Sequence, residues 1–219
     1  MHFTVKNLIN IQELINSNLI NPTTDKLPKI IAVSKTFGMD KIAPLIEHGH
    51  KDFGENKVQE ALDKWSDVKL TNQNIKLHLI GGLQTNKVKF AIRLFDYIHS
   101  VDSQKLAKKI ADEQKKQNEK VKIFLQVNIG SEIQKFGVDK SRLGDLCSFC
   151  KSIELDVVGL MCIPPVGEPS TKYFKEMNDL NQSLNLDYLS MGMSSDYLEA
   201  VKNNSTHLRI GSSIFGNRI

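Results

Sequence analysis

A lysine that follows an apolar run is the residue of this sequence best suited to covalent chemistry. Lys35 comes just after residues 30–33, Ile-Ile-Ala-Val, and such a mostly β-branched run predicts a strand covered on both faces, as in a parallel sheet. Ligands of parallel α/β folds bind at the carboxyl ends of the strands. A lysine amine partly removed from water there has a lowered pKa and can form a Schiff base with an aldehyde. The alternative is a solvated lysine whose aliphatic stem lies along the strand end.

A second group of residues, near the end of the chain, is suited to binding an anion. Ser194 follows one apolar run, and Gly211 and Ser212 follow the last one. In closed α/β barrels, the loops after strands seven and eight frequently bind phosphate, together with a helix amino terminus. Arg209 stands inside the last run, where a guanidinium is costly to bury without an acceptor. The alternatives are turn glycines, a helix cap at Ser194, and an internal salt bridge from Arg209 to Glu55.

Three further candidate residues stand in or just after other apolar runs. Asn56 follows the second predicted strand, His78 lies inside the third, and Met191 ends the seventh. If the strands are parallel, their carboxyl ends meet at one edge, and these residues belong to the same site as Lys35. Asn56 is equally well explained as a helix cap.

The elements that must position these residues alternate between strand and helix along the chain. A helix over residues 8–19, stopped by Asn21-Pro22, comes first. Strands are predicted over residues 29–35, 51–54, 76–80, 97–101, 121–129, 155–163, 188–191 and 207–210. Helices are predicted over residues 39–48, 57–65, 87–95, 104–118, 141–151, 171–184 and 194–201. Eight strands, each but the last followed by a helix, predict a (β/α)8 TIM barrel rather than a doubly wound sheet.

The length of the chain bounds its domain organisation. Its 219 residues lie near the lower limit of roughly 200 residues for this fold, which leaves no room for a second domain. We therefore expect a single barrel domain over residues 1–219, with residues 1–28 forming an amino-terminal helix and a lead-in to the first strand.

Composition argues against several classes of protein. The net charge of +4 comes from lysines dispersed among acidic residues, so a nucleic-acid partner is not indicated. The amino terminus lacks the order of a signal peptide, and no uncharged apolar run reaches the roughly 18 residues of a membrane span. We expect a soluble cytoplasmic protein with no membrane partner. Cys147, Cys150 and Cys162 are too few for a disulfide framework, and buried thiols are expected rather than a zinc or redox site.

Taken in order, the segments at the expected strand ends resemble those of a known family. They are Ala32-Val33-Ser34-Lys35, Phe53-Gly54-Glu55-Asn56, residues 78–87, His99-Ser100-Val101-Asp102, Gln126-Val127-Asn128, Gly159-Leu160-Met161, residues 189–194 and Arg209-Ile210-Gly211. The family is that of the pyridoxal-phosphate homeostasis proteins, also called the YggS/PROSC family. Departures from its pattern are mild: Leu79 replaces a frequent phenylalanine, Lys57 a frequent aromatic residue, and Ser212 the usual threonine, which keeps the hydroxyl.

The resemblance implies a fold and a cofactor. The fold is a barrel similar to the amino-terminal domain of alanine racemase, with pyridoxal 5′-phosphate (PLP) bound as a Schiff base to Lys35. The implied cofactor contacts are Asn56 near the ring oxygen, Arg209 at the pyridine nitrogen, Ser194 with the amides of Gly211 and Ser212 at the phosphate, and His78 and Met191 completing the set.

Two functions fit such a site. A PLP homeostasis protein stores, buffers or delivers the cofactor without turnover, and its expected acceptors are apo PLP-dependent enzymes; this is what the resemblance implies. A PLP-dependent amino-acid racemase is the alternative, and it needs a base on each face of the substrate carbon. In alanine racemase the second base is a tyrosine from a further domain of the partner subunit, and here only His78 and Tyr188 are local candidates. We predict the homeostasis role, without enzymatic turnover, in a monomer.

One more lysine lies near the expected mouth of the barrel. Lys135 belongs to the polar loop after the fifth predicted strand. A second amine close to Lys35 could accept the aldehyde during release of the cofactor. A solvated loop lysine is the favoured interpretation.

Overall fold

The described parts of the chain form a closed barrel of parallel strands. The structure is a computed structural model, and it describes residues 1–19, 27–132 and 136–217. Each strand pairs with the next, and β8 closes onto β1. The strands are β1 (Lys29–Val33), β2 (Asp52–Glu55), β3 (Lys76–Leu79), β4 (Tyr97–Val101), β5 (Lys122–Val127), β6 (Asp156–Cys162), β7 (Tyr188–Ser190) and β8 (His207–Ile210). The predicted eight-stranded TIM barrel is confirmed.

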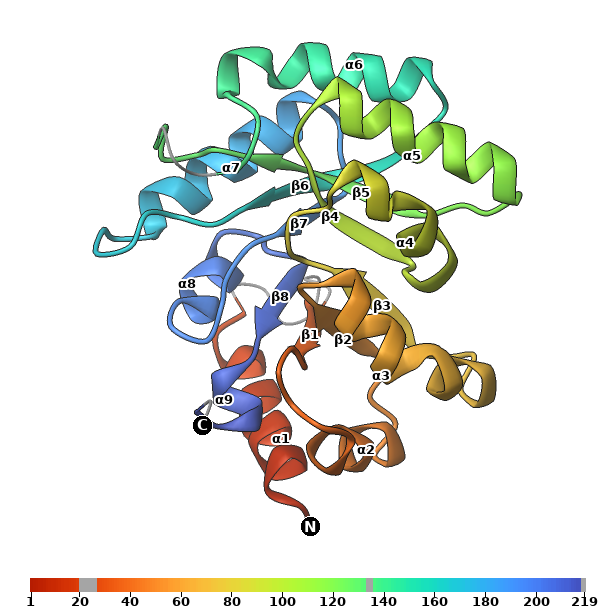
Figure 1. Ribbon diagram of the computed structural model, residues 1–219. Helices are drawn as coiled ribbons and strands as arrows, with labels where there is room; N and C mark the ends of the chain where they lie inside the picture. The colour runs from red at the N-terminus through yellow and green to blue at the C-terminus, as the bar shows by residue number, and fades with distance from the viewer. Residues whose placement is uncertain (20–26, 133–135, 218–219) are drawn as a thin grey trace.

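Helices connect consecutive strands on the outside of the barrel (Figure 1). The connecting helices are α2 (Met39–Glu47), α3 (Val58–Thr71), α4 (Val88–Leu94), α5 (Gln104–Gln117), α6 (Leu143–Ser152), α7 (Thr171–Ser183) and α8 (Tyr197–Lys202), with short 3-10 turns η1 (Thr85–Lys87) and η2 (Lys140–Arg142). Helix α1 (Phe3–Ser17) precedes β1, and α9 (Ser212–Phe215) follows β8. The first helix, α1, packs against α2 and α9, so the two ends of the described chain lie close together (Figure 1).

Two helices differ from the sequence prediction in places that bear on the site. The helix expected to open at Ser194 begins at Tyr197. The carboxylate of Asp196 accepts a hydrogen bond from the backbone N–H of Met193 (2.7 Å), which holds residues 194–196 in a turn. A short helix, α9, follows β8, where the apolar pattern predicts none. The predicted stop at residues 21–22 lies outside the described residues.

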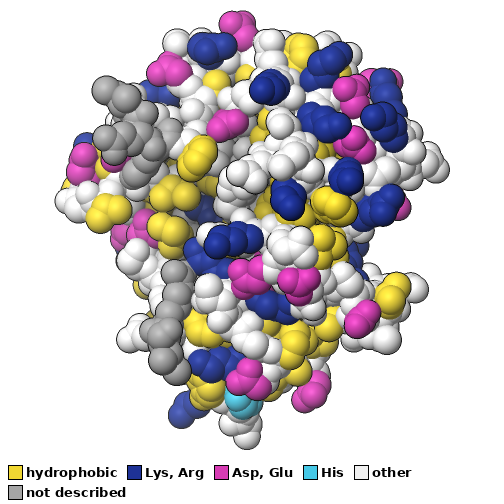
Figure 2. All heavy atoms as spheres, in the orientation of Figure 1, with side chains coloured by type: hydrophobic (Ala, Val, Ile, Leu, Met, Phe, Trp, Pro, Cys, Tyr) yellow, Lys and Arg dark blue, Asp and Glu magenta, His cyan; other side chains and the backbone are white. Residues whose placement is uncertain are grey.

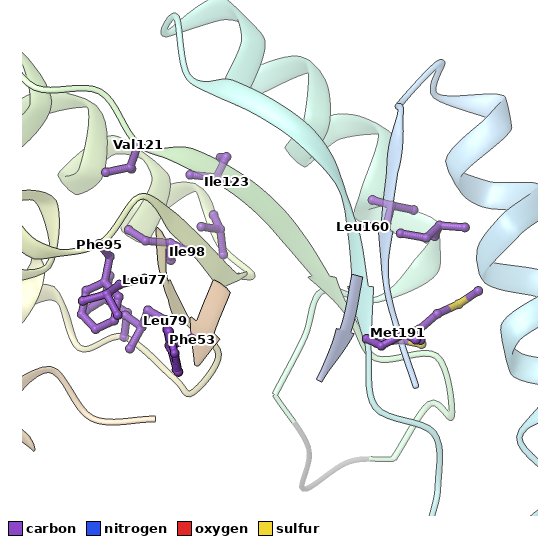
Figure 3. Close-up of a cluster of buried hydrophobic side chains, with 14 of the residues drawn as sticks. Phe53, Leu77, Leu79, Phe95, Ile98, Val121, Ile123, Leu160 and Met191 are labelled. Carbon is purple, nitrogen blue, oxygen red and sulfur yellow. The ribbon is translucent and has the colours of Figure 1, made fainter. Parts of the chain in front are cut away.

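Residues of each strand alternate between the lumen of the barrel and the helix layer. The outward side chains form a large buried cluster under the helices, which includes Phe53, Leu77, Leu79, Ile98, Ile123 and Leu160 (Figure 3). A smaller cluster consists of Tyr97, Phe124, Val158 and Met161. Burial of each large apolar side chain stabilises the folded state by about 1.5–3 kcal/mol. The two clusters together therefore hold the strand ends in fixed positions.

The surface and the cysteines agree with an ordinary globular protein. In the described part of the chain, no helix combines the length and the apolar character needed to cross a membrane. On the face shown in Figure 2, Lys and Arg side chains lie among Asp and Glu side chains. Cys147, Cys150 and Cys162 are buried free thiols, as predicted. Burial raises the pKa of Cys150 and of Cys162 to about 12, which keeps both thiols protonated.

Candidate cofactor site at the carboxyl end of the barrel

Lys35 stands just beyond β1, in register with the residues that line the lumen. Gly54 of β2 packs against Ile31 and Val33, and a Cβ atom added to this glycine would lie 2.9 Å from Cγ2 of Ile31. The two-residue period of the strand gives Lys35 the direction of Ile31 and Val33, whereas Ser34 faces the helix layer and is fully buried. Lys35 is half-buried. Its position is therefore that of an amine at the mouth of the barrel.

Hydrogen-bond donors converge after β7 and β8. The hydroxyl oxygen of Ser194 accepts hydrogen bonds from the backbone N–H groups of Gly211 (3.3 Å) and Ser213 (3.2 Å). The expected contribution of the Ser212 amide to an anion site stays a prediction; this exposed residue begins α9, between the two residues whose amides donate to Ser194. No described residue accepts the hydroxyl proton of Ser194, so this hydroxyl can still donate. A hydroxyl and two backbone amides so close together suit an anion such as phosphate.

Arg209 is a buried cation within β8, with only 4% of its surface exposed. Its guanidinium donates to the carbonyl oxygen (2.6 Å) and the hydroxyl oxygen (2.7 Å) of Ser190, and to the carbonyl oxygen of Cys162 (2.8 Å). All three acceptors are neutral, and burial lowers the pKa of Arg209. These bonds occupy three of the five N–H donors of a guanidinium, so two donors are left for a ligand.

The predicted alternative of a salt bridge between Arg209 and Glu55 is wrong. Glu55 points outward from β2, toward α3, and is fully buried there. Its Oε1 atom accepts hydrogen bonds from Lys64 Nζ (2.9 Å), Trp65 Nε1 (2.9 Å) and Ser34 Oγ (2.7 Å). This cluster ties the end of β1 and β2 to α3, so Glu55 is not a partner of Arg209.

A cavity of about 650 Å³ lies beside Asn56, lined by the loops that follow β2 to β5. Ser100 lines it, is 3% exposed, and its hydroxyl has no hydrogen-bond partner among the described residues. The pairing of β4 with β5 shifts between Ile98 and Val101, and such a bulge changes the direction of the side chains within it. Ser100 is therefore a candidate ligand contact; the sequence places its segment at the strand ends but does not give the direction of its side chain, because a bulge breaks the two-residue period.

Two residues of the predicted set lie elsewhere. His78 faces the lumen, but it is fully buried toward the amino-terminal end, where its ring stacks on Tyr97 (4.4 Å between centroids) and bonds to Asp52 (3.0 Å). Met191 is fully buried in the outer hydrophobic cluster (Figure 3), because Ser190 takes the lumen position of β7 and the next side chain points outward. The structure does not bring these two side chains to the mouth.

Lys135 lies outside the described residues, and its role stays a prediction.

The fold and the donor set together define a class of protein. Residues 13–218 match the family model of the amino-terminal domain of alanine racemase. The alanine racemase of Clostridium difficile 630 is similar in structure, with a TM-score of 0.75 and 17% sequence identity, over 99% of this chain and 57% of that one. At this identity the likeness concerns the fold alone. The chain is thus a barrel of the alanine racemase type.

More similar relatives narrow the class to one family. The chain is 36% identical, over 87% of both lengths, to the pyridoxal phosphate homeostasis protein of Aquifex aeolicus (strain VF5). The structure of PipY from Synechococcus elongatus PCC7942, solved with PLP bound, has a TM-score of 0.85 and 30% identity, over 97% of this chain and 100% of that one. The chain belongs to the pyridoxal phosphate homeostasis protein family, as its motifs predict.

Proposed function

We propose that this protein binds PLP at the carboxyl end of the barrel and stores, buffers or delivers the cofactor without catalytic turnover. The observation that carries the proposal is the buried guanidinium of Arg209, which lies in the lumen, donates to three neutral oxygens and has two N–H groups that no described residue accepts. The relatives support it, since one is named for PLP homeostasis and another was solved with PLP bound.

The residues at the mouth fit the three parts of PLP. The amine of Lys35 suits the aldehyde. The hydroxyl of Ser194, together with the amides of Gly211 and Ser213, suits the phosphate. The guanidinium of Arg209 suits the pyridine nitrogen. Asn56, beside the adjoining cavity, suits the ring oxygen. When bound, PLP supplies an electrophilic carbon and a ring that withdraws electrons.

The charge of Arg209 favours binding over turnover. A cation beside the pyridine nitrogen disfavours protonation of that nitrogen, since two adjacent positive charges repel. The ring then withdraws electrons poorly, whereas enzymes that stabilise a carbanion usually place an acid at this nitrogen. Arg209 therefore suits a protein that holds the cofactor rather than one that uses it.

The racemase alternative gains no support from the two local candidates for a second base. Tyr188 packs edge-on against His207 (5.1 Å between ring centroids), at the first residues of β7 and β8. His78 stacks on Tyr97, at the first residue of β4. Both side chains lie toward the amino-terminal ends of the strands, while Lys35 follows the carboxyl end of β1.

Transfer of PLP tests the proposed function against the racemase. PLP-loaded protein is mixed with an apo PLP-dependent enzyme, and the activity regained by that acceptor is followed, while a chiral assay measures racemisation of alanine and serine. We expect transfer to the acceptor and no racemisation above buffer. Enzyme-like racemisation that disappears in Lys35→Ala would overturn the proposal.

The proposal also includes a cytoplasmic monomer, and a sedimentation mass of twice the chain would contradict the monomer.

A further inference from the structure

A continuous series of hydrogen bonds runs through the lumen from Arg209 to Asp52. Arg209 Nη1 lies 2.7 Å from Ser190 Oγ, which lies 2.8 Å from His99 Nδ1. His99 Nε2 lies 3.0 Å from His78 Nδ1, and His78 Nε2 lies 3.0 Å from Asp52 Oδ1. The three middle residues are fully buried. We refer to these five residues as the lumen chain.

The carboxylate end of the lumen chain determines the direction of its hydrogen bonds. Asp52 only accepts, so His78 carries a proton on Nε2. Burial lowers the pKa of His78 and, more strongly, that of His99, so both imidazoles are neutral near pH 7. The Nδ1 atom of His78 then accepts from Nε2–H of His99, and the Nδ1 atom of His99 accepts from the hydroxyl of Ser190. Ser190 in turn accepts from Arg209, and every bond runs the same way.

This common direction matters because Arg209 is a buried cation whose hydrogen bonds among the described residues all go to neutral oxygens, while Asp196 acts on it only through its charge. Each neutral member of the lumen chain presents an acceptor toward the guanidinium and a donor toward Asp52. Aligned hydrogen bonds polarise one another in a medium of low dielectric. The cation at one end and the anion at the other therefore stabilise each other through the groups between them.

The far end of the lumen chain meets solvent on the opposite side of the barrel. Asp52 is the first residue of β2, and its side chain is 18% exposed. Lys29 lies 3.9 Å from its carboxylate. Both residues line a cavity of about 390 Å³ between α1 and the amino-terminal end of the barrel, beside His50 and Lys51. A change of charge at Asp52 is thus made outside the cofactor mouth.

We propose that Ser190, His99, His78 and Asp52 are positioning residues for Arg209: they hold its guanidinium at the mouth, and they transmit the charge of Asp52 to it. Only the effect on the cofactor ring rests on the proposed function. The direction of the hydrogen bonds is a property of the protein alone and is tested without PLP.

Other titratable groups face the lumen chain and must be separated from it in a test. They are Lys29 from β1, His50 before β2, Asp96 before β4, Tyr97 from β4, Cys162 from β6, Tyr188 from β7, Asp196 after β7 and His207 from β8. His207 provides a matched control. It is 1% exposed and its ring lies 6.1 Å from that of His78, but its Nδ1 atom pairs with Thr206 Oγ1 (2.8 Å) instead.

Nitrogen-15 NMR of the apo protein reads the tautomers directly. We expect His78 and His99 to be neutral near pH 7, each with its proton on Nε2. A proton on Nδ1 of either ring, or a doubly protonated ring, would overturn the lumen chain, whatever becomes of the proposed function.

The second test uses Asp52→Asn in the PLP-loaded protein. The new amide oxygen can still accept from His78, so the variant removes the charge and keeps the bond. We expect the midpoint of the pH titration of bound-PLP absorption to fall by about half a pH unit, because loss of an anion disfavours protonated forms. The midpoint of His207→Gln should equal that of the wild type. An unshifted Asp52→Asn midpoint, or an equal shift in His207→Gln, would overturn transmission to Arg209. If the wild type takes up no PLP, the proposed function fails and the NMR tautomers still decide the lumen chain.

Discussion

Glu55 and Arg209 are buried charged residues of the same barrel, but only Glu55 forms an ion pair at contact distance with another described residue. Glu55 faces the helix layer, where Lys64 supplies a positive charge 2.9 Å away. Arg209 faces the lumen, where its nearest acceptors are the neutral oxygens of Ser190 and Cys162. A buried charge that is paired at contact distance joins elements of the fold. A buried charge without such a partner marks a place where a ligand supplies what the protein does not.

The difference follows from which side of the sheet each residue faces. The helix layer is closed by α3, so Glu55 takes its partners from the protein itself: three donors meet at Oε1, while Oε2 has none among the described residues. The lumen opens at the carboxyl ends of the strands, where a bound molecule can complete the set. The Glu55 cluster in the helix layer therefore contributes to stability, whereas Arg209 in the lumen is placed to bind a ligand.

The largest expected effect comes from Lys35→Ala, which removes the proposed covalent attachment. We expect the absorption of bound PLP to disappear completely while the unfolding curve of the apo protein stays close to that of the wild type, because the side chain is only half-buried. Absorption titrated with PLP and urea unfolding measure the two properties. Lys57→Ala, at an exposed lysine beside the neighbouring cavity, is the control and should keep the absorption. Retained absorption in Lys35→Ala would place the attachment on another amine.

Glu55→Gln should have the next largest effect, and on stability alone. It leaves the buried ammonium of Lys64 without its closest counter-charge, and we expect the free energy of unfolding to fall by about 3 kcal/mol. Urea unfolding of the apo protein measures this loss. Glu199→Gln, which breaks an exposed ion pair with Lys202, should leave the unfolding curve unchanged. A folded Glu55→Gln protein with greatly weakened PLP binding would break the comparison.

Arg209→Gln should show the opposite pattern. Loss of a charged donor at the mouth should weaken PLP binding about tenfold, equivalent to ~1.4 kcal/mol. The cost in stability should be smaller than for Glu55→Gln, because the variant also removes the desolvation penalty of a buried cation. Binding titrations and urea unfolding of the same preparation compare the two. If Arg209→Gln loses more stability than Glu55→Gln and binds PLP normally, Arg209 is a structural residue.

The smallest effect concerns the pH dependence of the apo protein. Burial, with a lesser effect of nearby His78, lowers the pKa of His207 from 6.5 to about 3. The unfolded chain then binds a proton between these values while the folded chain does not, so stability is complete above pH 6.5 and falls as the pH drops toward 3. Urea unfolding across this range should give a shallower fall for His207→Gln. Identical slopes would show that His207 is protonated without cost in the folded protein.

The barrel could be predicted because its signals are local. Residues 30–33 form a short apolar run rich in β-branched residues, residues 97–101 and 207–210 are short segments between turns, and β1, β4 and β8 lie where these segments predict strands. The start of α8 is harder to predict, because the carboxylate of Asp196 stabilises a turn over residues 194–196 and the spacing of apolar residues does not indicate this turn.

The site could be predicted only in part, because side-chain direction depends on register. Lys35, Ser194 and Arg209 stand where parallel strands must end. Met191 was assigned to the site from its neighbourhood, but the two-residue period sends its side chain into the outer cluster. The lumen chain joins residues that are far apart in the sequence, such as His99 and Ser190, and no local sequence pattern predicts such a contact.

Reduction and mapping of the wild-type protein test the central claim most directly. PLP-loaded protein is treated with borohydride, which fixes the cofactor to the amine that holds it, and the peptides are then mapped by mass. We expect the added mass on the peptide that contains Lys35, at one cofactor per chain. An added mass on any other lysine, or none on the protein, would contradict it.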